Sequence, residues 1–341
     1  MSAAVTRIAV IVPARDCANL LVACAAQILK QTRKVDEIVI SVGPSADGTA
    51  EVAQALAATA DTLRVVQNPA GDRGSALNVA LDGLKSEFVA MVDAQSLIEL
   101  DYVDAALKVI DQTDAAVVGG PMRPRGRTAI GRAMAAALRS PFGVGNSQFH
   151  FGGQAREVDS VYLGVYRRAA LQAVGPYNPG LLRTEDDDMN ARLRASGMRF
   201  WMDPTIRSTY LCRSTLREVW SQYYGYGYWK VALGTIRPEA IRLRQFVPAV
   251  FVLGLTAAAV TSTLAWWPAL FVVFGAYVVL GATAASLAPA DGLAARVLFV
   301  PVALTMHLAY GIGSLAGLVG WRQVAAAARS DSGHRGTGIR P

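Results

Sequence analysis

The sequence predicts an α/β domain with a mostly parallel sheet, followed by a C-terminal region of membrane-spanning helices. Residues 1–130 read as strands and helices in alternation, which is typical of a parallel sheet covered by helices. Residues 246–320 carry only two full charges, Asp291 and Arg296, among three long apolar blocks. About 20 consecutive apolar residues are enough to cross the hydrocarbon core of a bilayer.

The alternation can be followed from the amino terminus. Apolar runs predict strands at 7–13, 36–43, 63–68 and 87–93. Helical apolar spacing predicts helices at 17–31, 47–60 and 74–85. Asp47 stands where an N-cap of the second helix is expected. Since ligands of such sheets gather at the carboxyl ends of strands, the residues that follow these strands are the first candidates for a binding site.

The apolar blocks predict a multi-pass protein of the cytoplasmic membrane. They cover residues 246–265, 269–288 and 297–320. Arg237, Arg242 and Arg244 precede the first block, and positive charge beside a span marks the cytoplasmic face. Three spans are favoured on length, although a basic tail would then lie outside. The alternative that one block is re-entrant stays open.

The expected division of the chain is a cytoplasmic domain at 1–235, a basic juxtamembrane segment at 236–245, about three membrane helices within 246–320, and a disordered tail at 321–341. A signal peptide is not expected, because the first apolar run, 8–12, is too short. Three cysteines fit a reducing compartment and suit neither a disulfide framework nor a zinc site. The net charge of +7 lies largely beside the predicted spans, which favours anionic lipid headgroups over nucleic acid as partner.

Two acidic motifs are candidates for chemistry. Asp93 follows the fourth predicted strand and precedes Ala94 and Gln95, although an acid there can also serve as a turn or cap residue. Four consecutive acids, Glu185 to Asp188, precede a predicted helix. Their mutual repulsion is partly offset by the positive first turn of that helix, so a purely structural acidic N-terminus is the alternative.

Several segments, taken in the order in which they occur in the chain, resemble those of family 2 glycosyltransferases, which have the GT-A fold. "IAVIVPARD", "GSALNVAL" and "EFVAMVDAQS" resemble the nucleotide-sugar-binding half. "FGVGNSQFHFGG", "RTEDDDMNARLRASG" and "SQYYGYGYW" are similar to the membrane-bound exopolysaccharide branch, notably the succinoglycan-type glucosyltransferases. The resemblance covers about residues 5–235. It implies an inverting transfer from a nucleoside-diphosphate sugar to a polyprenyl-diphosphate-linked saccharide at the cytoplasmic membrane face.

The resemblance implies a donor site at the strand ends. Asp93 corresponds to the first acid of the DxD motif, and Gln95 replaces the second. Both are then ligands of Mg²⁺ or Mn²⁺, which a neutral amide holds less tightly. The other implied donor-binding residues are Pro13, Arg15, Asp16, Ser45, Asp47, Arg73 and Ala94. Arg15, Asp16 and Arg73 could equally be solvated loop charges. Val42 replaces an acid that contacts the base in relatives, which leaves the nucleotide open.

The resemblance also implies the catalytic residues. Thr184, Glu185 and Asp186 match a TED motif, in which Asp186 is the general base, and Asp188 helps to place the acceptor. Gln222, Trp229 and Arg213 are the implied acceptor-binding residues. The segment 221–230 lacks the arginine of the QxxRW motif of processive relatives, and it also suits an amphipathic interfacial helix.

Two other functions remain as alternatives. One is a polyprenyl-phosphate sugar synthase or a processive synthase, which would differ in its acceptor. The other is a catalytically silent scaffold of a polysaccharide assembly complex, which the replacements at Val42 and Gln95 would permit.

Overall fold

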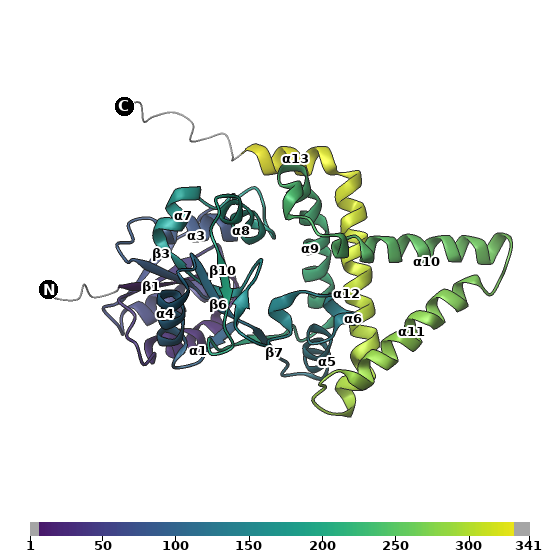
Figure 1. The fold of residues 1–341 in the computed structure, drawn as a ribbon, viewed down its shortest axis with the longest axis horizontal. Coiled ribbons are helices and arrows are strands. Elements are labelled where there is room, and N and C mark those ends of the chain that lie inside the picture. The colour runs from purple at the N-terminus through teal and green to yellow at the C-terminus, as the bar shows by residue number, and fades with distance from the viewer. Residues whose placement is uncertain (1–6, 331–341) are drawn as a thin grey trace. The chain divides into compact units, whose positions relative to one another are not determined.

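The computed structural model describes residues 7–330, which divide into two compact units (Figure 1). The first unit comprises residues 1–123 and 151–210, and the second comprises residues 124–150 and 211–341. The chain therefore leaves the first unit within β7, returns near residue 151, and leaves it finally within β11.

The first unit is built on an eight-stranded sheet with the order β3-β2-β1-β4-β9-β6-β10-β8. The predicted strands are confirmed as β1 (Ile8–Ala14), β2 (Glu37–Val42), β3 (Leu63–Gln67) and β4 (Phe88–Met91). They pair in parallel, β1 with both β2 and β4, and β2 with β3. Because both faces of these strands are covered, the runs are continuously apolar rather than alternating.

The other half of the sheet is mixed. Its strands are β6 (Val117–Gly120), β8 (Arg156–Glu157), β9 (Tyr162–Arg167) and β10 (Phe200–Met202). β9 lies antiparallel between β4 and β6, whereas β10 is parallel to β6. A small second sheet has the order β5-β11-β7 and comprises β5 (Ser96–Ile98), β7 (Met122–Arg125) and β11 (Ser208–Leu211).

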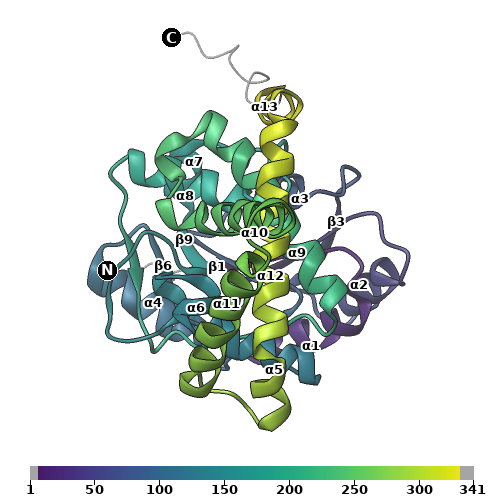
Figure 2. The same cartoon turned by 90° about the vertical axis from the view of Figure 1, so that its right-hand side faces the viewer.

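Helices cover both faces of the large sheet. α1 (Ala18–Leu29), α2 (Thr49–Ala57) and α4 (Tyr102–Thr113) share one apolar core with alternate residues of β1, β2 and β4. α3 (Arg73–Leu81), α7 (Arg168–Val174) and α8 (Glu185–Ala195) lie on the other side (Figure 2). The N-cap of α2 is Gly48 in a left-handed conformation, which corrects the expectation that Asp47 occupies this position.

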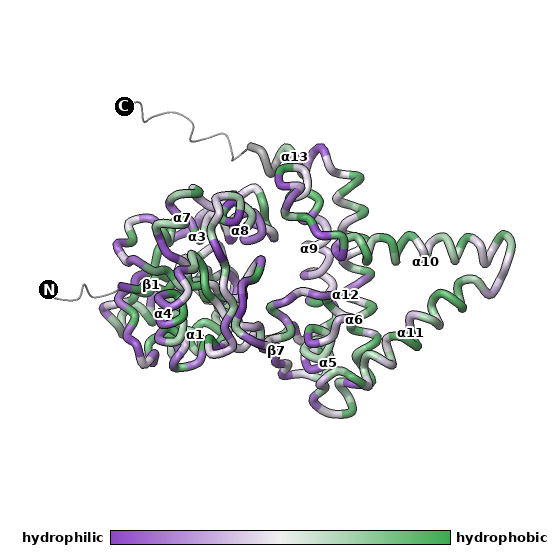
Figure 3. Tube along the Cα trace, viewed as in Figure 1, coloured by the Kyte–Doolittle hydropathy of each residue, from purple (hydrophilic) through white to green (hydrophobic). Residues whose placement is uncertain are grey.

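The second unit is helical. Its helices are α5 (Ala129–Leu138), α6 (Pro141–Val144), α9 (Leu216–Ile236), α10 (Val247–Leu264), α11 (Ala269–Leu287), α12 (Leu293–Val319) and α13 (Trp321–Ser330). The three apolar blocks are thus helices, each long and apolar enough to cross a membrane (Figure 3). A capping box of Thr215 and Glu218 starts α9.

Two expected boundaries differ from the structure. Residues 124–150 and 211–235 group with the C-terminal helices instead of with the α/β unit. Residues 321–330 form α13 where disorder was expected, and this alanine-rich segment has high helix propensity. The rest of the tail, residues 331–341, lies outside the described residues.

Close backbone contact explains why α9 belongs with the C-terminal helices. A Cβ at Gly227 of α9 would collide with the Tyr310 carbonyl oxygen of α12, and a Cβ at Gly313 would collide with the Tyr224 carbonyl oxygen. Small residues that let two helix backbones approach are typical of helix pairs in membrane proteins. The α9–α12 pair therefore depends on glycine at these positions.

We expect Gly227→Ala to lower the melting temperature of the detergent-solubilised protein by several degrees. Forcing an added methyl into a packed contact costs about 1–3 kcal/mol. Gly275→Ala in α11 is the matched control, because a Cβ there meets no atom within 4 Å. That substitution should leave stability unchanged or raise it, since alanine is the better helix former. Equal melting curves for both variants would contradict the close α9–α12 packing.

Candidate active site

Three segments far apart in the sequence meet at the carboxyl edge of the parallel strands in the first unit. They are the start of α3, the residues just after β4, and the start of α8. Arg73 opens α3, Asp93 follows β4, and Glu185 opens α8. The structure therefore brings together a predicted donor-binding cation, the predicted DxD acid and the predicted TED motif.

Arg73 bridges the two acids. Its Nη2 lies 2.9 Å and its Nε 3.2 Å from the Asp93 Oδ1, and its Nη1 lies 2.8 Å from the Glu185 Oε1. Burial disfavours the charged guanidinium, but the carboxylates of Asp93, Glu185 and Asp186 outweigh this effect. They raise the pKa of Arg73 well above its ordinary value, so the side chain stays positive at any working pH.

Local structure fixes Arg73 in place. Asp72 caps α3 by accepting a hydrogen bond from the Ser75 amide at 2.7 Å. Gly74 packs against the backbone at Asn178 and Pro179, where a Cβ would lie 3.1 Å from the Asn178 carbonyl oxygen. The start of α3 is thus tied to the segment that leads into α8.

Glu185 is the buried member of the TED motif. Its side chain is 4% exposed, and its second carboxylate oxygen, Oε2, is buried and has no hydrogen-bond partner among residues 7–330. Its position in the first turn of α8 places it in the favourable field of the helix N-terminus. A buried and unpartnered carboxylate oxygen beside a cation has room to accept a hydrogen bond from a bound ligand.

The remaining acids of the motif have different surroundings. Asp186 is exposed, and its Oδ1 accepts a hydrogen bond from the Asp187 amide at 2.9 Å. Asp188 is buried and forms an ion pair with Arg192 at 2.9 Å. Arg192 also donates to the carbonyl oxygens of three consecutive residues at the end of α7, namely Val174, Gly175 and Pro176. This network gives Asp188 an anchoring contact, whereas Asp186 faces solvent.

The predicted donor-binding residues of the first two loops bind each other. The Asp16 carboxylate accepts from the Ala46 amide at 3.0 Å, and the Asp16 amide donates to the Ser45 hydroxyl at 3.1 Å. Asp47 accepts from the Ala18 amide at 2.9 Å and from Thr49. Its hydrogen bonds, first that of the Thr49 hydroxyl, lower the pKa of Asp47. The network joins the β1–α1 and β2–α2 loops.

Two other donor-site predictions fall on the same edge. Arg15 is exposed and donates to the Gly71 carbonyl oxygen at 3.0 Å, which links the first loop to the segment before Arg73. Pro13 lies within β1, opposite Ser41 of β2. Pro13 is thus part of the sheet, and Arg15 links two loops at its carboxyl edge.

The acids near Arg73 suit a metal only in part. Among residues 7–330, no group of three or more His, Cys, Asp or Glu side chains is arranged to hold an ion. Asp93 is about one-third exposed, Gln95 is half-buried, and the intervening Ala94 is buried. Mg²⁺ is commonly held by one or two carboxylates together with substrate phosphates and water. Asp93 and the Gln95 amide are therefore only candidates for such a site, together with the oxygens of a bound diphosphate.

The predicted acceptor-binding residues belong to the second unit. Gln222 is buried in α9, its Oε1 accepts from Arg213 Nε at 3.3 Å, and its Nε2 donates to the Tyr226 hydroxyl at 2.8 Å. The Trp229 ring packs edge-on against Tyr228 with centroids 5.7 Å apart. Gln222 and Trp229 thus each contact an aromatic neighbour within α9.

Sequence reasoning missed two residues that support the site. Tyr177 exchanges hydrogen bonds with Asn78, whose side chain binds the Tyr177 carbonyl oxygen at 2.9 Å and its amide at 2.8 Å. Tyr166 of β9 lies near Arg73 and Asp186, and burial, together with the Asp186 charge, raises its pKa. These contacts join residues far apart in sequence, so no local pattern signals them.

The comparisons with known proteins all point to one family of enzymes. Residues 6–224 match the Glycosyltransferase like family 2. The chain belongs to this family and is a transferase of sugars.

A curated relative matches almost the whole chain. The Succinoglycan biosynthesis protein ExoA of Rhizobium meliloti is 28% identical over 297 residues, covering 84% of this chain and 87% of the relative. Glycosyltransferase GlyG of Streptococcus pneumoniae is 29% identical over 114 residues, covering 33% of this chain and 38% of the relative. The solved structure of S. aureus TarS 1-349 in complex with UDP-GlcNAc has a TM-score of 0.51 at 18% identity, covering 93% of this chain and 92% of that one. This last likeness supports the GT-A fold of the α/β unit.

We expect Arg73→Gln to destabilise the first unit by about 1–3 kcal/mol, because it leaves the buried Glu185 carboxylate without its partner. Glu185→Gln in the same chain removes that charge and should recover part of the loss. Denaturant unfolding of the two single variants and the double variant gives the coupling directly. Fully additive effects would contradict the ion pair.

Proposed function

We propose that the protein is an inverting glycosyltransferase that moves a sugar from a nucleoside-diphosphate sugar to a polyprenyl-diphosphate-linked saccharide. The reaction takes place at the cytoplasmic membrane face, in exopolysaccharide or cell-envelope glycan synthesis. The observation that carries the proposal is the Arg73 bridge, because it joins a donor-side acid to the acids of α8. Similarity to ExoA along 84% of the chain supports the exopolysaccharide setting.

On the donor side, the chain must stabilise a departing diphosphate. Arg73 supplies a fixed positive charge that is already in position before the donor binds, which is the efficient form of electrostatic stabilisation. A divalent cation bound by Asp93 and Gln95 would add further charge neutralisation of the phosphate oxygens. Arg15, which is exposed at the same edge, would contact the nucleotide.

On the acceptor side, the chain must remove a proton. In the proposed step, the acceptor oxygen forms a bond to the anomeric carbon while the bond to the diphosphate oxygen breaks. The hydroxyl proton passes to the Asp186 carboxylate, and the electron pair leaves with the diphosphate. A single displacement of this kind inverts the anomeric centre. Asp186 is exposed and can reach an acceptor, whereas Glu185 is held by Arg73 and orients the start of α8.

The second unit provides the proposed acceptor side of the protein. Arg213, Gln222 and Trp229 would contact the lipid-linked saccharide or its diphosphate. Arg237, Arg242 and Arg244 precede α10, where basic side chains attract anionic lipid headgroups.

The overall proposal can be tested with membranes that contain the protein. They are incubated with a panel of radiolabelled nucleoside-diphosphate sugars, and the lipids are extracted. One donor should give label in a polyprenyl-diphosphate-linked saccharide that has grown by one sugar. Label in a polyprenyl-monophosphate sugar, in a long polymer, or in no lipid at all would argue for one of the alternative functions.

Asp186→Asn should lower kcat about a hundredfold or more, because it keeps the shape of the side chain and removes the base. Binding of the nucleotide donor should persist. Asp187→Asn, one residue along the same helix turn, is the control and should retain most activity. Near-normal turnover in Asp186→Asn would remove Asp186 from the role of base.

Gln95→Asp should lower the Mg²⁺ or Mn²⁺ concentration needed for half-maximal activity, because a second carboxylate binds a hard cation more tightly than an amide. The measurement is a metal titration of the initial rate for both forms after removal of bound ions. If both forms keep full activity in excess EDTA, no cation acts at Asp93.

A further inference from the structure

Helix α12 differs from α10 and α11 in what surrounds it. Of the most apolar stretch of α12, 33% is buried, compared with 11% for α10 and 17% for α11. One face of α12 packs against α5 and α9, while α10 and α11 extend away from it as a hairpin (Figure 1, Figure 2). The three apolar helices therefore do not have equivalent positions.

The contacts between the α10–α11 hairpin and α12 indicate how deep α12 lies in the bilayer relative to the ends of the hairpin. The start of α10 contacts α12 near its end, because a Cβ at Gly311 would collide with the Pro248 carbonyl oxygen. The end of α11 contacts α12 near its start, where Arg296 donates to the Ser286 carbonyl oxygen at 2.9 Å. A Cβ at Gly281 of α11 would lie 3.1 Å from Val300.

These contacts are incompatible with three parallel spans. In a chain that enters the bilayer at Pro248, the start of α10 and the end of α11 lie at the same membrane surface. If α12 then crossed from that surface, Gly311 would lie about 27 Å deeper than Leu293, at the opposite surface. Yet Gly311 contacts Pro248. The start of α10 and the end of α11 therefore both contact α12 at the same membrane surface. It follows that α12 runs along that surface.

The partners of α12 lead to the same conclusion. α9, which contacts the Tyr310–Gly317 part of α12, carries Arg217, Glu218 and Lys230. α5, packed against α12 as well, contains Arg132. A charged side chain at the centre of a bilayer costs about 2.5–3.5 kcal/mol on insertion scales, so helices of this composition belong outside the hydrocarbon.

The exposed face of α12 is nevertheless apolar. Its exposed and half-exposed residues at helical spacing are Val297, Pro301, Leu304, Leu308, Ile312, Leu315 and Val319. The opposite face holds small or fully buried residues, among them Ala295, Phe299 and Met306. A helix that is covered by protein on one side and exposes an apolar stripe on the other suits the boundary between headgroups and acyl chains.

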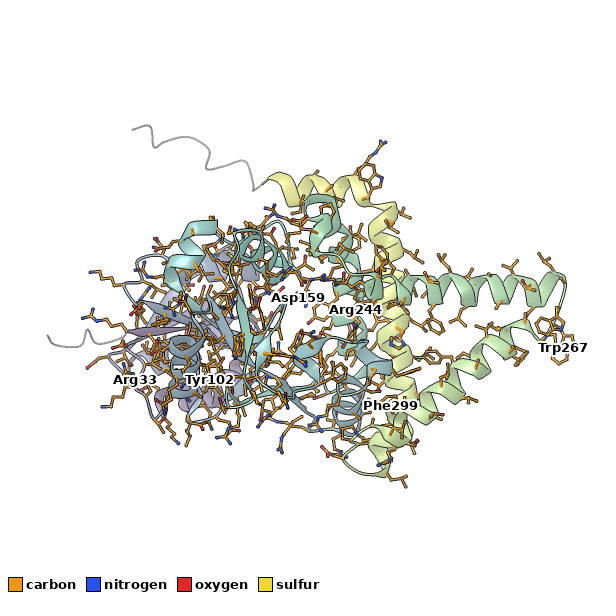
Figure 4. All side chains as sticks on the ribbon, viewed as in Figure 1. Arg33, Tyr102, Asp159, Arg244, Trp267 and Phe299 are labelled. Carbon is orange, nitrogen blue, oxygen red and sulfur yellow. The ribbon has the colours of Figure 1, made fainter. Side chains whose placement is uncertain are left out.

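The hairpin has the dimensions of a crossing pair. α10 has 18 residues and α11 has 19, which corresponds to about 27–29 Å and matches a hydrocarbon core of about 30 Å. Its tip carries Trp266 and Trp267, which are 54% and 73% exposed (Figure 4). Tryptophan favours the interfacial zone of a bilayer, here the one opposite to α12.

We propose that the protein contacts the bilayer through two distinct surfaces: the α10–α11 hairpin, which crosses it, and the apolar stripe of α12, which lies in the plane of the cytoplasmic leaflet. The chain then crosses the membrane twice, and α13 lies on the same side of the membrane as α9. This differs from the three spans expected from block length. It also places Arg322 on the side that the positive-inside rule favours.

Cysteine accessibility tests the topology independently of the proposed enzymatic function. In a background with Cys17, Cys24 and Cys212 replaced by alanine, single cysteines are introduced at Gln323 and at two exposed reference positions, Lys85 and Ala265. Intact and permeabilised cells are treated with a membrane-impermeant maleimide. Gln323→Cys should react only after permeabilisation, as Lys85→Cys does, while Ala265→Cys at the hairpin tip should react on intact cells.

Labelling of Gln323→Cys on intact cells would show that α12 crosses the bilayer and would overturn the proposal. Absence of labelling of Ala265→Cys on intact cells, with reaction after permeabilisation, would overturn the crossing of the hairpin. Retention of each variant in the membrane fraction and an unchanged melting temperature show that the compared proteins are folded.

Depth measurements test the second surface. A fluorophore attached to Leu308→Cys, near the middle of α12, is compared with one on Ala257→Cys, an exposed position near the middle of α10, in vesicles with quenchers at known depths. Shallow quenchers should act more strongly at position 308 and deep quenchers more strongly at position 257. Stronger quenching of position 308 by the deep quencher would place α12 across the bilayer and contradict the proposal.

Discussion

The guanidinium of Arg73, held between the carboxylates of Asp93 and Glu185, is the interaction on which the α/β unit's site depends. Two acids at such short range repel each other unless a cation lies between them. Burying an acid without a partner costs more than the pair returns, so each member requires the others. The bridge couples the end of β4 to the start of α8 and thereby holds the TED motif at the carboxyl edge of the parallel strands.

Within α8, position in the helix gives four similar acids different properties. The helix N-terminus attracts all of them. Glu185 turns inward to Arg73, Asp188 turns inward to Arg192, and Asp186 is left facing solvent. Two partly buried ion pairs therefore fix the helix on either side of Asp186. The proposed role of Asp186 as the base calls for a fixed and exposed carboxylate, and this arrangement is compatible with that proposal.

The second unit solves a different physical problem, which is how to attach polar helices to a bilayer. Glycines in α9 and α12 let the two backbones touch. The charged helix α9 therefore packs directly against the apolar helix α12. α12 can then expose apolar side chains to lipid on one face while α5 and α9 cover the other. The start of α10 and the end of α11 both contact α12. In the proposed arrangement, one helical unit therefore both anchors the protein in the membrane and supports the acceptor side.

The sequence by itself determined the parts that rest on local periodicity and composition. Continuous apolar runs identified β1 to β4, apolar length identified α10 to α12, and the DAQ and TEDDD segments predicted Asp93 and Glu185 as candidate site residues, since these signals extend over a few neighbouring residues. Only the tertiary structure decided how they combine. It placed Arg73 between acids 20 and 112 residues away, left Asp186 exposed and Asp188 paired, and moved residues 124–150 to the helical unit. It also packed α12 against α9, and the proposed in-plane position of α12 rests on this contact, whereas hydropathy alone predicts a third span. Each of these outcomes depends on contacts between distant segments, and the free energy of such contacts is set by packing and charge in three dimensions, which leave no periodic trace in the chain.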